Sequence, residues 1–325
     1  STCDRRAGVH CPSRAAQMCL AQVARSVWRV GSGRPRVAIL GGVHGNERTG
    51  IEVVRRLVGR LSDASAASAV TGELTLALGN PEAVDRDVRF VQVDLNRCFG
   101  GRSRGPSSGE SLEHRRAGEL EHFLKDLDAM VDIHATNKPS APFARLPGAV
   151  EDGYFGRCEE LFLSSLPQQC QTVLWDPDGL IADGTMSDEF ALRHAPRSGG
   201  SYICYEAGLA SDVEAVPDTE AAVDALLARL GVLQTASLGE LTASQRRWTH
   251  YRITEVFQLD DRGFQWMNGH GQANFQKIPA GEAYGRRGPH GSELVAAEES
   301  YMVFPKVEAL WSPGRPLGWL ARRLP

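Results

Sequence analysis

Short apolar runs alternate with helical periods between residue 26 and about residue 230, and this alternation constrains the fold more than any other feature. Four runs are typical of buried strands: Arg36–Leu40, Glu73–Leu78, Ala129–Ile133 and Tyr202–Tyr205. Strands that alternate with helices pair in parallel, and the side chains that follow them meet at one edge of the sheet. The sequence therefore predicts an α/β fold with its functional residues at the carboxyl ends of the strands.

Three helices are predicted between and after these strands. The first has one apolar face, formed by Ile51, Val54, Leu57 and Leu61. A second, amphipathic helix is predicted from Ser108 to Leu127, and a third from Thr219 to Leu230.

Beyond about residue 247 the pattern changes to short aromatic or β-branched runs separated by glycine and proline. Trp248–Phe257, Gly263–Met267 and Tyr301–Phe304 are such runs, and they predict a small antiparallel β domain. We expect an α/β domain at residues 1–240 and a C-terminal β domain at residues 241–325. The segment Gly100–Gly109, rich in Gly, Ser and Arg, is predicted to be a mobile loop.

Bulk properties exclude several classes of protein. Apolar residues make up 42% of the 325 residues and charged residues 23%, the balance of an ordinary globular protein. The formal net charge of −4 is too small and too mixed in sign to indicate a nucleic-acid or membrane surface. No apolar stretch reaches the roughly 18 residues that span a bilayer. The first twenty residues lack the apolar core of a signal peptide, so a cytoplasmic location is expected.

The cysteines give no sign of a metal or disulfide framework. There are seven, without a Cys-x-x-Cys pair. Cys3, Cys11 and Cys19 recur every eight residues, but no histidine or cysteine completes a ligand set at the usual spacing. We interpret this recurrence as a coincidence.

The segment Gly41–Gly50 joins the first strand to the first helix and reads Gly-Gly-Val-His-Gly-Asn-Glu-Arg-Thr-Gly. His44 and Glu47 stand three residues apart, a spacing at which an imidazole and a carboxylate can bind one cation. His134, at the end of another predicted strand, supplies a third ligand. Two histidines and one glutamate leave a coordination position open, as in hydrolytic zinc enzymes. A lone His-x-x-Glu is more often a surface pair, but its place among glycines at a strand end favours the metal site.

Two arginines and an asparagine follow within Arg89–Arg97. Asn96 and Arg97 place an amide donor beside a guanidinium, which suits the recognition of a carboxylate. Arg89 is a second cation of the same region and could polarise a carbonyl group. Taken alone, these residues could equally be surface arginines.

Glu206 stands at the end of the strand Tyr202–Tyr205, where a carboxylate is costly to bury unless it is paired or functional. Close to zinc it could take a proton from water and pass it to a departing amine. The structural alternative is a glutamate that caps a helix or forms a salt bridge.

In their order, these segments resemble the succinylglutamate desuccinylase/aspartoacylase family. The motifs are Gly-x-His-Gly-Asn-Glu, Asn-Pro, a segment from Arg89 through Asp-Leu-Asn-Arg to Phe99, Asp-x-His and Glu-x-Gly, and they extend from about Ala38 to Glu206. The resemblance implies a mixed sheet with helices on both faces, similar to zinc carboxypeptidases, and a small C-terminal antiparallel β domain that caps the active site.

The resemblance also implies the roles of the site residues. One zinc ion per chain would be bound by His44, Glu47 and His134. Glu206 would act as general acid and base, and Arg89 would polarise the carbonyl group. The substrate carboxylate would be bound by Asn96 and Arg97.

Within the family the chain looks nearer to the bacterial desuccinylases than to the animal aspartoacylases. The segments that indicate this are Leu78–Pro81, Phe99–Arg102, Phe143–Pro147 and Phe304–Pro305. The implied reaction is zinc-dependent hydrolysis of a linear amide in a small acidic N-acyl amino acid. N-succinylglutamate, cleaved to succinate and glutamate, is the favoured substrate, and another such as N-acetylaspartate stays open.

The sequence leaves further alternatives open. The cation for a second substrate carboxylate could be Lys138, Arg193 or Arg197, each of which could equally be a plain surface residue. A metallocarboxypeptidase would use similar motifs, although a C-terminal β cap would restrict its cleft. A non-catalytic zinc- or ligand-binding protein would need no proton shuttle. We expect no nucleic-acid or membrane partner, and both a homo-oligomer and a divalent metal other than zinc stay open.

Overall fold

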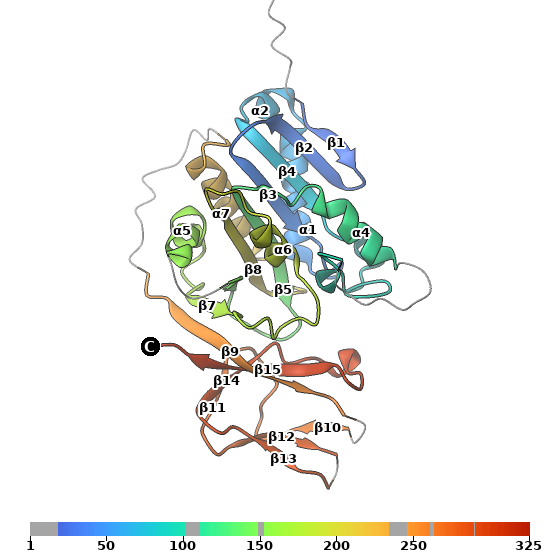
Figure 1. Cartoon of the computed structure of the whole chain (residues 1–325), viewed down its shortest axis with the longest axis vertical. Coiled ribbons are helices and arrows are strands. Elements are labelled where there is room, and N and C mark those ends of the chain that lie inside the picture. Colours follow the sequence, from blue (N-terminus) through green and yellow to red (C-terminus); the bar gives the residue numbers. More distant parts are fainter. Residues whose placement is uncertain (1–18, 102–110, 149–152, 234–245, 261–262, 289) are drawn as a thin grey trace, which may run out of the picture.

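The computed structural model describes residues 19–101, 111–148, 153–233, 246–260, 263–288 and 290–325. Its main element is a twelve-stranded sheet in the order β1-β2-β4-β3-β5-β8-β6-β7-β9-β15-β14-β11, and a separate three-stranded sheet has the order β10-β12-β13. Figure 1 shows the long helices around the upper part of the large sheet and the last strands of the chain below it.

The elements have the following bounds. The strands are β1 Ala21–Ala24, β2 Val27–Ser32, β3 Arg36–Gly41, β4 Gly72–Leu78, β5 Ala129–Thr136, β6 Phe143–Leu146, β7 Thr172–Trp175, β8 Ser201–Leu209, β9 Thr249–Gln258, β10 Phe264–Trp266, β11 Gln276–Ile278, β12 Ala283–Arg287, β13 Glu293–Val295, β14 Ser300–Val303 and β15 Pro316–Arg323. The α-helices are α1 Arg48–Leu61, α2 Ala64–Ser68, α3 Pro81–Arg86, α4 Leu112–Glu121, α5 Tyr154–Leu161, α6 Ser187–Arg193 and α7 Val216–Arg229. Short 3-10 helices span Leu95–Arg97, Leu163–Ser165 and Glu308–Leu310.

The four strands predicted for the α/β region form the centre of the large sheet. β3 pairs in parallel with β4 and β5, and β5 pairs in parallel with β8. β2 and β6 run antiparallel to β4 and β8, so the sheet is mixed. Every residue of β5 is buried, which explains why these runs are apolar throughout instead of alternating. The carboxyl ends of β3, β5 and β8 consequently lie side by side.

Helices cover both faces of this sheet, as the resemblance implied. α1 packs on β3, β4 and β5 and contacts α7, whereas α6 packs on β5 and β8. Figure 1 shows α6 in front of the sheet and α1 behind it. The predicted apolar face of α1 is buried, with Ile51, Val54, Leu57 and Leu61 turned inward.

One predicted helix is shorter than the sequence pattern indicated. α4 begins at Leu112 and ends at Glu121 rather than at Leu127, and residues 108–110 of the prediction lie outside the described part of the chain. A turn follows, in which Asp126 has a φ of 57°. Leu124 and Leu127 are nevertheless buried. The apolar pattern therefore continues through the turn, which is why it predicts too long a helix.

Four of the C-terminal strands continue the large sheet. β9 pairs in parallel with β7, and β15, β14 and β11 follow in antiparallel pairing. β10, β12 and β13 form the small separate antiparallel sheet. The predicted antiparallel β structure is present, but its junction with the α/β sheet was not predicted, because β7 and β9 are far apart in the sequence.

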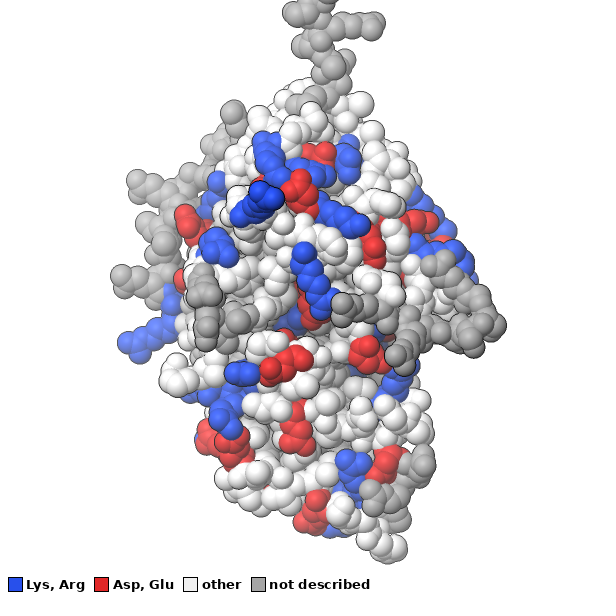
Figure 2. All heavy atoms as spheres, viewed as in Figure 1, with Lys and Arg blue, Asp and Glu red and all other residues white. Residues whose placement is uncertain are grey.

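Charged side chains of both signs are intermixed over the face shown in Figure 2, in keeping with the net charge of −4. Within the described ranges, no helix combines the length and apolar character that a membrane crossing needs. Cys3, Cys11, most of the predicted loop Gly100–Gly109 and the predicted domain boundary at residues 240 and 241 lie outside the described residues.

Candidate metal centre and substrate pocket

The turn between β3 and α1 brings backbone segments so close together that two of its positions require glycine. A Cβ atom on Gly41 would lie 2.1 Å from the carbonyl oxygen of Gly50, and one on Gly45 would lie 2.0 Å from the carbonyl carbon of Ala83. α1 can therefore begin directly against the end of β3, with Glu47 as its N-cap residue. This tight turn fixes the backbone that carries the first two predicted metal ligands.

His44, Glu47 and His134 converge in the interior, and each offers a ligand atom within 4.8 Å of the other two. Glu47 Oε1 lies 2.7 Å from His44 Nδ1, and Glu47 Oε2 lies 2.9 Å from His134 Nδ1. All three side chains are buried. Two imidazole nitrogens and a carboxylate at these distances form a donor set that suits zinc.

Each of these histidines faces a second carboxylate with its other ring nitrogen. His44 Nε2 lies 3.0 Å from Asp94 Oδ1, and His134 Nε2 lies 3.1 Å from Asp132 Oδ2. The His44–Asp94 contact is a hydrogen bond, which favours the proton on Nε2 and leaves the lone pair of Nδ1 for a metal, whereas the His134–Asp132 contact has an ion-pair distance without hydrogen-bond geometry. The donor set therefore fits a bound zinc ion. Both aspartates lie inside the sequence motifs, but residue spacing alone gave them no role.

The two glutamates at the centre differ in their protonation. Burial would raise the pKa of Glu47, but His44 and His134 outweigh it and hold that pKa well below its usual value. Glu206, whose backbone pairs with that of His134, is also buried, and burial together with the charge of Glu47 raises its pKa to about 7. Glu206 Oε2 has no hydrogen-bond partner among the described residues. One carboxylate is thus a fixed anion, and the other can take up or release a proton near neutral pH.

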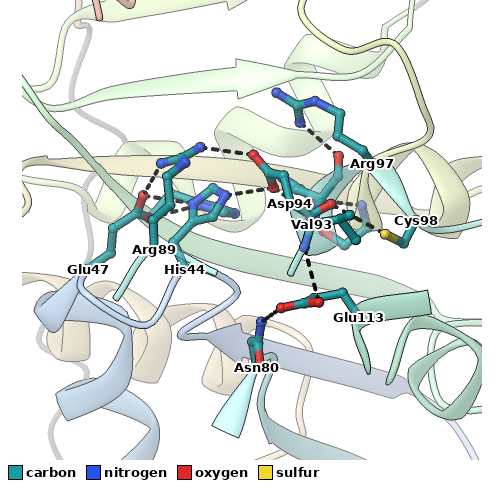
Figure 3. Close-up of polar contacts among 12 residues, drawn as sticks. His44, Glu47, Asn80, Arg89, Val93, Asp94, Arg97, Cys98 and Glu113 are labelled. Carbon is teal, nitrogen blue, oxygen red and sulfur yellow. Dashed lines mark hydrogen bonds and ion pairs between the residues drawn. The ribbon is translucent and has the colours of Figure 1, made fainter. Parts of the chain in front are cut away.

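Arg89 lies between Glu47 and Asp94, as Figure 3 shows. Its Nη1 donates to Glu47 Oε1 at 3.2 Å, and its Nη2 donates to Asp94 Oδ2 at 3.3 Å. The guanidinium is therefore held beside the metal-ligand cluster, where it can act on a group bound next to Glu47.

Asn96 and Arg97 belong to the 3-10 helix that follows Asp94. The Asp94 carboxylate accepts a hydrogen bond from the Asn96 N–H at 3.0 Å and caps this turn. The N–H of Ser187 donates to Asn96 Oδ1 at 3.0 Å, which leaves the amide nitrogen of Asn96 as a donor for a ligand. Arg97 Nη1 donates to its neighbour's backbone oxygen, and its Nε lies 3.7 Å from the exposed Asp183.

One pocket of about 600 Å³, part of it open to solvent, collects all seven predicted site residues. The seven residues are His44, Glu47, Arg89, Asn96, Arg97, His134 and Glu206.

Of the three candidates for a second carboxylate, Lys138 lines the pocket, whereas Arg193 and Arg197 are not among its lining residues. Among the lining residues that were not predicted are Arg145, Asn274 and Lys306. Arg145 lies in a short strand, and the other two lie in the C-terminal β region. No local pattern marks them, because only long-range packing brings them to the site.

The positive charge of Arg145 is balanced by carboxylates inside the protein. It is 1% exposed and forms ion pairs with Asp188 and Glu189 of α6. Burial opposes its charge, but these carboxylates outweigh it and raise the pKa of Arg145. α6 therefore holds this guanidinium in place, although it lines the pocket.

Glu113 organises the segment that leads to Asp94. Its fully buried carboxylate accepts the N–H groups of Val91, Gln92 and Val93 at 2.7, 3.2 and 3.2 Å. It also accepts the side-chain amide of Asn80 at 3.2 Å, and Figure 3 shows this arrangement below Asp94. The carboxylate thus orders the loop between Arg89 and the metal cluster.

We expect Glu113→Ala to lower the free energy of unfolding by about 3 kcal/mol, because several buried donors lose a charged acceptor. Urea unfolding of the purified protein measures this change. Glu119→Ala on the same helix is the matched control, since Glu119 is exposed and pairs only with Arg116 through an ion pair worth at most about 1 kcal/mol. Equal stability of the two variants would contradict the role given to Glu113.

Comparison with known proteins supports a family assignment. Residues 33–161 match the family model described as the succinylglutamate desuccinylase/aspartoacylase catalytic domain. The chain is 40% identical over 108 residues to a succinylglutamate desuccinylase of Pseudomonas paraeruginosa, an alignment that covers 33% of this chain and 31% of that protein. It is 25% identical over 281 residues to the succinylglutamate desuccinylase of Yersinia pseudotuberculosis, covering 83% of this chain and 79% of the relative.

The fold agrees with that of a solved structure. The succinylglutamate desuccinylase of Vibrio cholerae superposes with a TM-score of 0.72 at 19% sequence identity, covering 94% of this chain and 88% of that one. At this identity the likeness concerns the fold, while the matched segment at residues 33–161 includes His44, Glu47, Arg89, Asn96, Arg97 and His134. Residues 33–161 thus match the catalytic-domain model of the succinylglutamate desuccinylase/aspartoacylase family, and the fold of the chain is similar to that of a solved desuccinylase.

Proposed function

We propose that this protein is a zinc-dependent amidohydrolase that removes the acyl group from a small acidic N-acyl amino acid. The observation that carries the proposal is that one pocket contains a His–Glu–His donor set, the Asn96–Arg97 pair and Glu206, whose Oε2 has no hydrogen-bond partner among the described residues. N-succinylglutamate, hydrolysed to succinate and glutamate, is the substrate we favour, because the relatives compared above are desuccinylases.

His44, Glu47 and His134 would hold one zinc ion per chain. When bound there, zinc would supply Lewis acidity that polarises a carbonyl group and lowers the pKa of water. Asp94 and Asp132 would orient the two imidazoles through their Nε2 atoms.

The remaining steps belong to the side chains of the pocket. Glu206 takes a proton from the attacking water, and the water oxygen forms a bond to the amide carbon. Arg89 donates to the oxygen that gains negative charge in the tetrahedral intermediate. Glu206 then gives its proton to the amide nitrogen as the carbon–nitrogen bond breaks. A pKa of about 7 suits both transfers, since the group can accept and return a proton near neutral pH.

Asn96 and Arg97 would bind a substrate carboxylate. The free amide nitrogen of Asn96 and the guanidinium of Arg97 offer adjacent donors, and the 3-10 helix capped by Asp94 keeps them in place. Adjacent donors of this kind recognise a carboxylate by position as well as by charge.

We further propose that residues 1–240 form the catalytic domain and residues 241–325 a β domain that caps its active site. Asn274, Phe304, Lys306 and Trp319 come from the second part and line the same pocket, which supports the proposal. Such a cap would restrict the site to small substrates and disfavour a metallocarboxypeptidase. A cytoplasmic location and a homo-oligomeric state also belong to this proposal as expectations from the sequence.

A substrate panel tests the proposal. Zinc-loaded protein should release free amino acid from N-succinylglutamate faster than from N-acetylaspartate, N-acetylglutamate or N-formylglutamate, and a chelator should abolish the release. Peptides with free and with blocked carboxyl termini serve as the comparison. Cleavage of the free peptides alone would identify a carboxypeptidase, and preference for N-acetylaspartate would keep the reaction and change the substrate. Zinc binding without any turnover would indicate a binding protein.

A further inference from the structure

More cationic than anionic side chains line the pocket. Five cationic side chains line it, and two of them are held by buried or half-buried carboxylates: Arg89 by Glu47 and Asp94, and Arg145 by Asp188 and Glu189. Arg97 forms an ion pair with the exposed Asp183 at 3.7 Å, and the remaining two cations are Lys138 and Lys306. If Arg97 takes one substrate carboxylate, a cationic surplus remains that can bind a second.

Among these cationic side chains, Lys306 has a position that contacts with neighbouring residues define. Its ammonium nitrogen lies 5.2 Å from the ring centroid of Trp319 and 5.9 Å from that of Phe304, so two aromatic rings flank it. Its backbone N–H donates to the Leu317 carbonyl of β15 at 2.8 Å. No carboxylate forms an ion pair with Lys306 within the described ranges. A half-buried ammonium group without a counter-ion is costly to keep and favourable to pair with an incoming anion.

The electrostatic surroundings of Lys306 connect it to the reacting groups. Burial lowers its pKa to about 7, Arg89 and Arg97 lower it further, and the carboxylates of Asp94 and Glu206 act in the opposite direction. Lys306 lines the same pocket as both arginines, and an anion bound beside it would favour the ammonium form.

Asn274 supplies an independent second donor. It is 9% exposed and lines the pocket, and its Oδ1 accepts the N–H of Phe304 at 2.6 Å. This contact fixes the orientation of the amide, because only the oxygen can accept. The Nδ2 atom is buried and has no hydrogen-bond partner in the described part of the chain. A buried amide donor left unpaired in a pocket indicates a ligand atom that accepts from it.

From these positions we infer that Lys306 and Asn274 form a second carboxylate-binding subsite, supplied by the C-terminal β region and separate from the Asn96–Arg97 pair. This inference rests on the proposed deacylase function. The substrate it selects carries at least two carboxylates, one for each subsite. Lys138 also lines the pocket, but within the described ranges no aromatic ring holds its ammonium group as Phe304 and Trp319 hold that of Lys306. Lys306 is therefore the specificity-determining cation.

Kinetics on four substrates test the subsite. The parent is N-succinylglutamate, which carries three carboxylates. N-butyrylglutamate lacks the acyl carboxylate, N-succinylglutamine lacks the side-chain carboxylate, and N-succinyl-4-aminobutyrate lacks the α-carboxylate. Lys306→Met should raise KM for the parent by about 10- to 100-fold with little change in kcat, because a charged hydrogen bond is lost. For one of the three analogues, the one that lacks the carboxylate bound by Lys306, the same substitution should have no effect. Asn274→Asp should also raise KM for the parent, because it keeps the acceptor for Phe304 and replaces the free donor with an anion.

Two lysine variants and a binding measurement complete the design. Lys277→Met is the control, since Lys277 is an exposed residue of the same β region and pairs with Glu299. A selective loss in Lys138→Met instead of Lys306→Met would overturn the inference, as would an equal loss on all four substrates. Calorimetry of the zinc-loaded protein with glutarate and with butyrate separates the subsite from the reaction. If Lys306→Met binds glutarate more weakly than wild type does but binds butyrate equally well, the subsite is supported even if no substrate is turned over. If wild type and variant bind glutarate equally well, the subsite is refuted.

Discussion

Replacing Glu206 with glutamine is expected to lower kcat by about 10³-fold, because a positioned general acid and base contributes roughly 10²- to 10⁴-fold to a rate. Glutamine has nearly the same shape but cannot take a proton from water or return one to the departing nitrogen. Zinc content should stay at the wild-type level, since His44, Glu47 and His134 are untouched. Steady-state kinetics and metal analysis of the same preparation measure both quantities.

The stability of the Glu206→Gln protein provides the control. Glu206 Oε2 has no hydrogen-bond partner among the described residues, and burial already disfavours the charged form, as its pKa of about 7 indicates. The neutral amide should therefore leave the melting temperature unchanged or raise it slightly. A kcat within about tenfold of wild type would remove Glu206 from the proton-transfer role, since that loss is below the usual range for such a group.

Replacing His134 with alanine should abolish both metal retention and activity. The variant loses one of three metal ligands. A bound metal lowers the activation free energy by several kcal/mol, and the loss of this contribution corresponds to a rate decrease of roughly 10³-fold or more. Metal analysis after dialysis, followed by kinetics with added zinc, measures the effect. Full activity without bound metal would contradict the assignment of the His–Glu–His cluster.

Asp94→Asn is the graded comparison for this prediction. It keeps all three ligands and removes the carboxylate that faces His44 Nε2. Substitutions of this kind usually weaken metal binding by about 10- to 100-fold, so added zinc should restore more activity to this variant than to His134→Ala. A variant that behaves like His134→Ala at every zinc concentration would show that Asp94 does more than orient an imidazole.

Local sequence patterns were sufficient to predict the centre of the fold and to name the residues that meet there. The four apolar runs became β3, β4, β5 and β8, and residues at or after the carboxyl ends of β3, β5 and β8 line one pocket. This succeeded because parallel strands place their ends together whatever the intervening sequence. The glycines around His44 were equally informative, since Gly41 and Gly45 lie in backbone contacts that leave no room for a side chain.

The features that sequence did not predict depend on contacts between distant segments. The parallel pairing of β7 with β9 extends the large sheet into the C-terminal region. It also brings Lys306 and Asn274 to a pocket built mainly by the first 210 residues. Arg145 was missed for a similar reason, because its partner Asp188 lies on a helix 43 residues further along the chain. Burial of a charged residue becomes interpretable only when its partner is known.

The central claim is that a metal held by His44, Glu47 and His134 is required for hydrolysis of an acyl amino acid. One preparation of wild-type protein should be divided into two halves. One half is stripped of metal with a chelator and is then titrated with zinc. Both halves are assayed for the release of succinate and glutamate from N-succinylglutamate. The account predicts no release from the stripped half, and equal release of both products that recovers fully at one zinc ion per chain. Release of both products at an undiminished rate by the stripped protein would contradict it.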